Sequence, residues 1–257
     1  MRLAIACLAA CLVTTAPVSA QSPGNGQLSV SYDPGADSRS NQIANSLREL
    51  AVFDALGQSV NESVHLPRNL FATFRNCGLA NAFYDPQKLE IVMCYELIAR
   101  VGDAARQWSD DDQEVGENIV GATSFFFLHE LGHALVDQLD LPTTGREEDA
   151  VDEIATLILL DGDAEGVKML SSAVQQFDDL AAQKQAVKDL AFWDEHPVDA
   201  QRMYNIMCLV YGSNPQAFKD MIGEGGLPEQ RAKGCPAEFT KKKRSWTRLL
   251  GPSLKPE

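Results

Sequence analysis

The sequence predicts a single α+β domain, in which a small antiparallel sheet is followed by a mostly helical body. Residues 70–74, 81–84 and 89–93 are short runs typical of strands, and a turn sequence at 85–88 separates the last two. Apolar residues on either side of this region recur at helical spacing. A chain of 257 residues can bury one sizeable core, so we expect the sheet and the helices to share it.

The other elements are expected in the following order along the chain. Residues 21–40 are rich in Ser, Gly, Asp and Pro, and we expect a disordered lead-in there. The domain is expected over residues 41–240. The basic run at 241–244 is expected to be solvated, and it opens a polar tail over 241–257. Apolar spacing predicts helices over residues 41–55, 95–108, 114–139, 147–160, 164–190 and 198–210.

Residues 1–20 have the composition of a secretory signal peptide. Arg2 is followed by an apolar run over 3–13, and small residues precede an expected cleavage after Ala20. We therefore expect an exported bacterial protein, periplasmic or secreted. A lipobox-like sequence ends at Cys11, but only ten residues precede this cysteine, so we do not expect a lipoprotein. The apolar run is too short to span a bilayer and no later stretch is expected to do so, which predicts no stable membrane insertion.

The chain is strongly acidic, with a formal net charge of −14. Removal of residues 1–20 takes away one arginine and no acid, which leaves 21 basic residues against 36 acidic ones and a net charge of −15. Such a surface favours solubility. It also excludes nucleic acid or an anionic membrane as the main partner.

Four cysteines remain after the signal peptide, and an even number in an exported protein favours disulfides over free thiols. The turn at 85–86 lies midway between Cys77 and Cys94. We therefore predict a Cys77–Cys94 bond that brackets a hairpin. Elimination then leaves a bond between Cys208 and Cys235.

The pattern H-E-L-G-H at 129–133 predicts a metal site. On a helix, His129 and His133 are four residues apart and project from one face, where both imidazoles can bind one metal ion. Glu130 lies beside the first histidine and can take a proton from a metal-bound water. Zinc in catalytic sites usually has three protein ligands and an open fourth position. A cluster of acids over 147–153 offers the third ligand.

Four carboxylates could be the third ligand, and they lie on different helical stripes, which are rows of residues three to four positions apart on one face of a helix. Asp149 and Glu153 share a mostly polar stripe, which we expect to face water. Glu147 and Glu148 begin stripes that turn towards the core. Glu148 alone has a carboxylate one turn later on its own stripe, Asp152, which could accept the second N–H of a zinc-bound histidine. We expect Glu148 as the ligand and Asp152 as its support, with Glu147 as the alternative ligand.

At this point the residues resemble a known group. H-E-L-G-H followed by Glu148 and Asp152 resembles the gluzincin branch of zinc metallopeptidases. In that branch two histidines and a glutamate on a following helix bind zinc, and the glutamate of the motif is the general base. His196 with Arg202 six positions later is similar to the H-P-x-x-x-x-R element of CAAX-prenyl endopeptidase-like gluzincins. There the histidine and the arginine lie near the substrate and steady the reacting carbonyl.

A second resemblance covers about residues 60–235. The segments 77–78 and 94–97, the H-E-L-G-H helix and residues 201–205 resemble an uncharacterised family of exported bacterial proteins described as metallopeptidases. This resemblance implies a minimal gluzincin fold. In gluzincins an edge strand above the zinc pairs with an extended peptide, so one strand of the hairpin between Cys77 and Cys94 is a candidate substrate edge.

The expected function is zinc-dependent hydrolysis of a peptide or protein substrate, with one Zn²⁺ per chain on His129, His133 and Glu148. Glu130 would be the general base. His196 or Arg202 would stabilise the oxyanion. The alternative is a zinc-containing binding module of the same fold without turnover, against which the retained Glu130 counts. A structural exported protein without metal is a further alternative.

Overall fold

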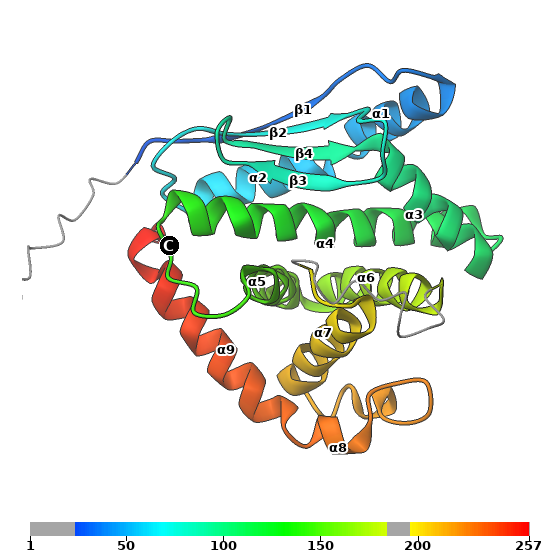
Figure 1. The fold of residues 1–257 in the computed structure, drawn as a ribbon, viewed down its shortest axis with the longest axis vertical. Helices are drawn as coiled ribbons and strands as arrows, with labels where there is room; N and C mark the ends of the chain where they lie inside the picture. The colour runs from blue at the N-terminus through cyan, green and yellow to red at the C-terminus, as the bar shows by residue number, and fades with distance from the viewer. Residues whose placement is uncertain (1–23, 184–195, 257) are drawn as a thin grey trace, which may run out of the picture.

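The computed structural model of the protein describes residues 24–183 and 196–256. These residues form layers, with a four-stranded sheet on one side of a long central helix and further helices on the other (Figure 1). The predicted α+β class is therefore confirmed. The predicted signal peptide at 1–20 and the lipobox-like sequence within it lie outside the described residues.

The helices follow the apolar spacing closely. The helix predicted at 41–55 is two helices, because Ala51 takes a left-handed conformation with φ 51° and separates them. The end of the helix predicted at 164–190 lies outside the described part of the chain. The large helices are α1 (Ser38–Leu50), α2 (Val52–Ser63), α3 (Tyr95–Trp108), α4 (Asp112–Gln138), α5 (Glu147–Asp161), α6 (Asp163–Gln183), α7 (Asp199–Ser213) and α9 (Cys235–Leu250), with α8 (Glu229–Ala232) and two 3-10 turns, Lys219–Met221 and Gly251–Ser253, as short elements.

The sheet is mixed, so the prediction of a purely antiparallel sheet is wrong. Its strand order is β1-β2-β4-β3, with β1 and β4 both parallel to β2. The expected hairpin is present, since β3 pairs antiparallel with β4. The parallel pairs arise because helices or long connections return the chain in the same direction. The strands are β1 (Leu28–Tyr32), β2 (Leu70–Arg75), β3 (Ala82–Asp85) and β4 (Glu90–Cys94).

The first strand lies within the segment that was expected to be a disordered lead-in, so that expectation is wrong for these residues. In β1, Leu28 is buried opposite Leu70. The ring of Tyr32 stacks on Phe74 with 5.0 Å between the ring centres. Polar serines alternate with these apolar residues, which lowers the mean hydropathy while keeping one face of the strand apolar.

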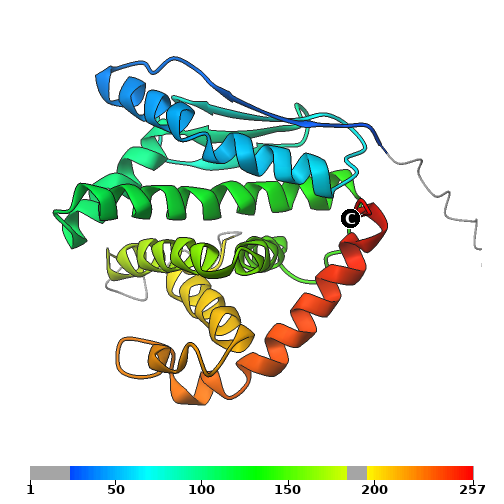
Figure 2. The ribbon, with the colours of Figure 1, turned by 180° about the vertical axis from the view of Figure 1, so that it is seen from behind.

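Helix α4 is the centre of the fold and is apolar around most of its circumference. By length and apolar composition, α4 is a described helix that could cross a membrane. This corrects our expectation that no stretch after residues 1–20 is long and apolar enough to do so. In this structure 78% of its apolar window is buried by the rest of the chain. Figure 2 shows α1 and α2 beside α4, beneath the β1 side of the sheet. The helix is apolar on all sides because the sheet and the lower helices enclose it.

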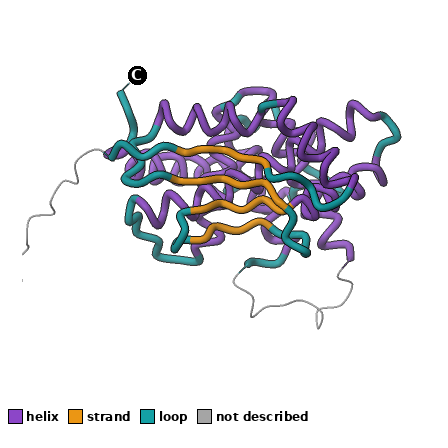
Figure 3. Tube along the Cα trace, turned by 90° about the horizontal axis from the view of Figure 1, so that it is seen from above, coloured by secondary structure: helices purple, strands orange, loops and turns teal. Residues whose placement is uncertain are grey.

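The sheet is covered on one face. Figure 3, seen from the side of the sheet, shows the strands in front with helices behind them. Along β2, Ala72 and Phe74 are fully buried, whereas Phe71 points outward and is exposed. The order of the strands leaves β3 at one edge, with its outer backbone unpaired by any described strand.

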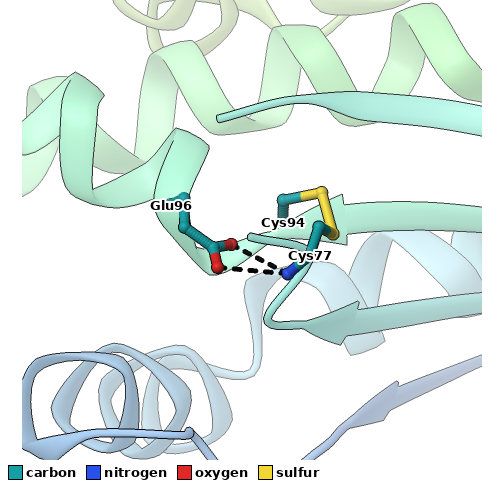
Figure 4. A group of neighbouring side chains, drawn as sticks. All are labelled: Cys77, Cys94 and Glu96. Carbon is teal, nitrogen blue, oxygen red and sulfur yellow. Dashed lines mark hydrogen bonds between the residues drawn. A yellow bond between two sulfur atoms is a disulfide. The ribbon is translucent and has the colours of Figure 1, made fainter. Parts of the chain in front are cut away.

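Both predicted disulfides are confirmed, Cys77 with Cys94 and Cys208 with Cys235. The first ties the loop after β2 to the end of β4 (Figure 4). Glu96, in the first turn of α3, accepts hydrogen bonds from the backbone N–H groups of Cys77 at 3.0 Å and Gly78 at 2.9 Å. Burial raises the pKa of Glu96, but the effect of these hydrogen bonds is larger, so the pKa is lowered overall. The loop that leads into the edge strand β3 is therefore held at two points.

The basic run belongs to α9, so residues 241–250 are part of a packed helix and do not form a tail, although Lys241, Lys243 and Arg244 are exposed as expected. Lys242 pairs with Glu153, and Lys243 lies 3.0 Å from Asp161, both on α5. Trp246 is buried and its indole N–H donates to Glu153 at 3.4 Å. The expectation that Glu153 faces water is also wrong, because α9 covers it. Helix α9 owes its amphipathic character to one tryptophan and to the aliphatic stems of its lysines, so composition did not reveal its buried face.

Helices α4 and α5 pack closely against each other at Gly132. A Cβ atom at this position would lie 2.8 Å from the Cβ of Val151 and 3.1 Å from the Cγ2 of Ile154. These distances are too short for any larger residue. The glycine of the H-E-L-G-H pattern therefore sets the spacing between the two helices that carry the histidines and the acids.

The substitution Gly132→Ala is expected to lower the free energy of unfolding by about 1–3 kcal/mol, since the methyl group forces α5 away from α4. Gly116→Ala on the same helix is the matched control, because a Cβ there meets nothing within 4 Å. Helix propensity should stabilise that variant by up to about 1 kcal/mol. Urea unfolding of both variants measures the difference. Equal stability of the two would contradict the close approach.

Candidate functional site

Helix α4 places three polar side chains of the H-E-L-G-H pattern at its buried C-terminal half. Asp111 starts the helix as its N-cap, accepting from the backbone N–H of Gln113 at 2.8 Å. His129 and Glu130 are buried, and His133 is largely so. The two imidazole rings lie on one face with 5.0 Å between their centres.

Glu148 on α5 lies between the two histidines. Its Oε2 is 3.2 Å from Nε2 of His129, and its Oε1 is 3.2 Å from Nε2 of His133. Glu148 is the carboxylate that the stripe analysis selected, and it is buried in spite of its charge. The close packing at Gly132 brings this first turn of α5 up to α4.

The three groups fit a metal ion better than they fit one another. Oε2 of Glu148 is buried and has no hydrogen-bond partner among the described residues, although the nitrogen of His129 is only 3.2 Å away. The short contact to His129 is therefore not an aligned hydrogen bond. Tetrahedral zinc with bonds of roughly 2.0–2.1 Å separates its ligand atoms by about 3.3 Å. Two imidazole nitrogens and a carboxylate at these spacings match that donor set.

His196 also reaches this point. Its Nε2 lies 3.2 Å from Oε2 of Glu148, and its ring is nearly parallel to that of His129 at 6.3 Å. The candidate donor atoms of His129, Glu148 and His196 all lie within 4.8 Å of one another. His196 differs from the others in its exposure, because nearly half of its side chain is accessible to solvent. It therefore forms the open wall of the site.

The outward nitrogen of each motif histidine meets a carboxylate. Nδ1 of His129 is 2.8 Å from Oδ1 of Asp152, and Nδ1 of His133 is 2.7 Å from Oε1 of Glu147. A carboxylate only accepts, so each Nδ1 carries a proton and each Nε2 faces the centre, where it can bind a metal in the unprotonated form. Asp152 lies where the sequence analysis expected it. Glu147, the alternative ligand, lies on the Nδ1 side of His133 and away from the centre.

Arg202 is not where the resemblance implied. We expected it beside the substrate, but it is buried on α7 behind His129. Its Nε donates to Oδ2 of Asp152 at 2.7 Å and its Nη2 to Oδ1 at 2.6 Å. The guanidinium carbon lies 4.4 Å from the centre of the Phe177 ring. The side chain turns inward because Asp152 is a buried carboxylate that needs a charged partner.

Burial and charge shift the pKa values of the site in a consistent pattern. Burial raises the pKa of Glu130, which the neighbouring histidines only partly offset. Burial would also raise the pKa values of Glu148 and Asp152. The histidines instead lower that of Glu148, and Arg202 together with His129 lowers that of Asp152 to about 2. Glu130 is thus the carboxylate best suited to accept a proton, while the other two stay ionised.

A cleft of about 770 Å³ opens over these groups. Its walls are the edge strand β3 with the following turn, the C-terminal part of α4, the start of α5, and His196. Tyr84 on β3 donates to Asp137 on α4 at 2.7 Å, which fixes the edge strand beside the cleft. The sequence analysis missed this pair. A tyrosine in a candidate edge strand and an acid one turn after His133 were the available signals.

In the metal-free protein, burial lowers the pKa of His133, but Glu148 and Glu147 raise it to about 9 from the ordinary 6.5. A raised pKa means that this pairing stabilises the fold fully below pH 6.5 and that the contribution is lost as the pH rises through about 9. We expect His133→Gln to lower the free energy of unfolding of the metal-free protein by at most about 3 kcal/mol at pH 6, and by much less at pH 10. Urea unfolding at the two pH values measures this. A deficit independent of pH would contradict it.

Comparison with known proteins places the chain in a family. It matches the family described as "Putative metallopeptidase" (DUF4344) over residues 32–250, which is more than half of its length and includes every site residue named above. No match was found among curated proteins or among solved structures. Membership implies a metal ion, and His129, Glu148 and His196 are a group that could hold one. The chain therefore belongs to this metallopeptidase family.

Proposed function

We propose that this protein is an exported zinc peptidase, which hydrolyses peptide bonds in peptide or protein substrates. One observation carries the proposal. Nε2 of His129 and Nε2 of His133 each lie 3.2 Å from the carboxylate of Glu148, whose Oε2 has no hydrogen-bond partner among the described residues, and Glu130 lies beside them in a cleft. This is the arrangement that metal-assisted hydrolysis needs.

His129, His133 and Glu148 would hold the zinc. Zinc bound there would lower the pKa of a water molecule and polarise the scissile carbonyl. Asp152 and Glu147 fix the ring orientation and tautomer of the two histidines through their Nδ1 protons. With both Nδ1–H groups fixed, the two Nε2 atoms face the same point, and binding a metal there requires the loss of any proton on them.

Glu130 would be the general base. Its carboxylate is buried at the floor of the cleft, where desolvation raises its pKa and so increases its affinity for a proton. It would take the proton of the attacking water and then pass it to the leaving amine. Of the other carboxylates that line the cleft, Glu148 would hold the metal, Glu147 accepts from His133 and Asp137 accepts from Tyr84.

His196 would stabilise the developing oxyanion. Its imidazole is partly exposed at the cleft wall and lies next to the metal-binding groups, so a substrate carbonyl in the cleft can reach it. A donor in this position typically contributes about 3 kcal/mol to lowering the barrier. Arg202 is excluded from this task by its burial behind His129.

The edge strand β3 would bind the substrate. Its outer backbone groups are unpaired by the described strands, and its residues form one wall of the cleft. An extended peptide added there gains main-chain hydrogen bonds with little dependence on its sequence. Unfolded segments of proteins are therefore the substrates that this site favours. The two disulfides support a location in an oxidising compartment, as the predicted signal peptide does.

Glu130→Gln is expected to reduce hydrolysis of unfolded casein by about 10²–10⁴-fold, because the amide cannot accept the proton. Zinc content should stay near one per chain, since Glu130 holds no metal. Glu117→Gln, the same change at an exposed position of α4, is the control and should cut at the wild-type rate. Undiminished cleavage by Glu130→Gln would reject the mechanism. Zinc-loaded wild-type protein that yields no fragments would indicate a non-catalytic binding module.

A further inference from the structure

We propose that Arg202 is a positioning residue, which acts on the metal site through Asp152 and does not contact the substrate. The proposal rests on the proposed function, since it concerns how His129 is held ready for zinc. The observations behind it are the two-point contact between Arg202 and Asp152, the burial of both side chains, and the position of Arg202 outside the cleft.

The guanidinium and the carboxylate form a fork. Nε of Arg202 donates to Oδ2 of Asp152 at 2.7 Å while Nη2 donates to Oδ1 at 2.6 Å. Two parallel bonds between planar groups fix both the position and the rotation of the carboxylate. A single bond would leave the carboxylate free to turn about its Cβ–Cγ axis. Oδ1 is therefore held at one point in space.

That oxygen is the one that meets His129. Oδ1 of Asp152 lies 2.8 Å from Nδ1 of His129, so it accepts from the imidazole and from Arg202 at once. Nη2 of Arg202 is itself 3.2 Å from Nδ1, but both are donors, so this contact follows from the shared oxygen. The arginine thus reaches His129 only through Asp152. Its effect is to set the direction of the ring and hence of Nε2.

The surroundings keep the fork in place. Arg202 stacks over the ring of Phe177 on α6, with 4.4 Å from the guanidinium carbon to the ring centre. Only 8% of Arg202 is exposed, and Asp152 is 5% exposed. To reach a substrate, the arginine would have to break two charged bonds and leave Asp152 buried without its counter-ion. Such a rearrangement is strongly unfavourable.

The cleft itself points to the same role. His196 and Glu130 are among the described residues that line it, and Arg202 is not. The second histidine supplies an internal contrast, because the carboxylate on its Nδ1, Glu147, is partly exposed and makes no forked contact with an arginine among the described residues. The arginine therefore fixes one of the two histidines, the more buried His129.

The test compares Arg202→Lys with Arg231→Lys. Lysine keeps the charge but cannot span both oxygens of a carboxylate. Arg231 also contacts a carboxylate at two points, through Nη1 and Nη2 to Glu238 at 2.8 and 3.0 Å and away from the site, so its variant controls for the loss of a forked ion pair. The dissociation constant for Zn²⁺ is measured by competition with a chelator, and the Co²⁺-loaded proteins give the visible absorption spectrum of the site. Thermal unfolding of the metal-free proteins reports folding separately.

We expect Arg202→Lys to bind Zn²⁺ about 10–100-fold more weakly and to change the Co²⁺ spectrum, with kcat reduced and KM unchanged. Arg231→Lys should keep the wild-type zinc affinity and spectrum. In an Asp152→Asn background, Arg202→Lys should cause no further loss of zinc affinity, because the path to His129 is already broken. An unchanged zinc affinity in folded Arg202→Lys, together with a raised KM, would overturn the inference and favour substrate contact.

A measurement on the wild-type protein serves if Arg202→Lys does not fold. The Nε–H signal of Arg202 is identified in ¹⁵N NMR spectra by its proximity to the Phe177 ring. It should shift when Zn²⁺ binds and stay unchanged when an inhibitory peptide is then added to the Glu130→Gln protein. A signal that stays unchanged when Zn²⁺ binds and shifts when the peptide is added would overturn this inference but not the proposed function. Wild-type protein that binds no zinc would overturn the proposed function together with it.

Discussion

The close approach of α4 and α5 at Gly132 is the constraint on which the rest of the site depends. Because no Cβ separates the helices there, the first turn of α5 lies directly beneath the histidine face of α4. Glu148 then falls between His129 and His133, with one carboxylate oxygen 3.2 Å from each. The sheet and the lower helices bury α4 from both sides, so this spacing is fixed by the packing of the whole domain.

The charges of the site are tolerated because each is compensated within a few ångströms. Buried carboxylates are costly in isolation, and burial alone would neutralise them. Asp152 is held ionised by Arg202 and His129, and Glu148 by the histidines. At Glu130 burial outweighs the neighbouring histidines, and the pKa is raised. One buried cluster therefore contains carboxylates that stay charged and one that is suited to exchange a proton.

The features that were predicted correctly from the sequence are those that depend on the spacing within a single helix or on a single turn. The four-residue spacing of the histidines and the Glu148–Asp152 stripe are properties of single helices, and the hairpin gave the Cys77–Cys94 pairing. Prediction from the sequence failed where a contact joins distant segments. The strand β1 becomes ordered by pairing with β2, about forty residues later, and α9 by its contacts with α5. The inward turn of Arg202 depends on α5 and α6 together, which no local pattern records.

The central claim is that one zinc ion is held between α4 and α5. The most direct test is a crystal structure of zinc-loaded protein, prepared without a histidine tag, with anomalous data collected at the zinc edge. The account predicts one anomalous peak, bound by Nε2 of His129, Nε2 of His133 and the carboxylate of Glu148 at roughly 2.0–2.2 Å. A peak bound by Glu147 in place of Glu148, or density without any zinc between the two histidines, would contradict it.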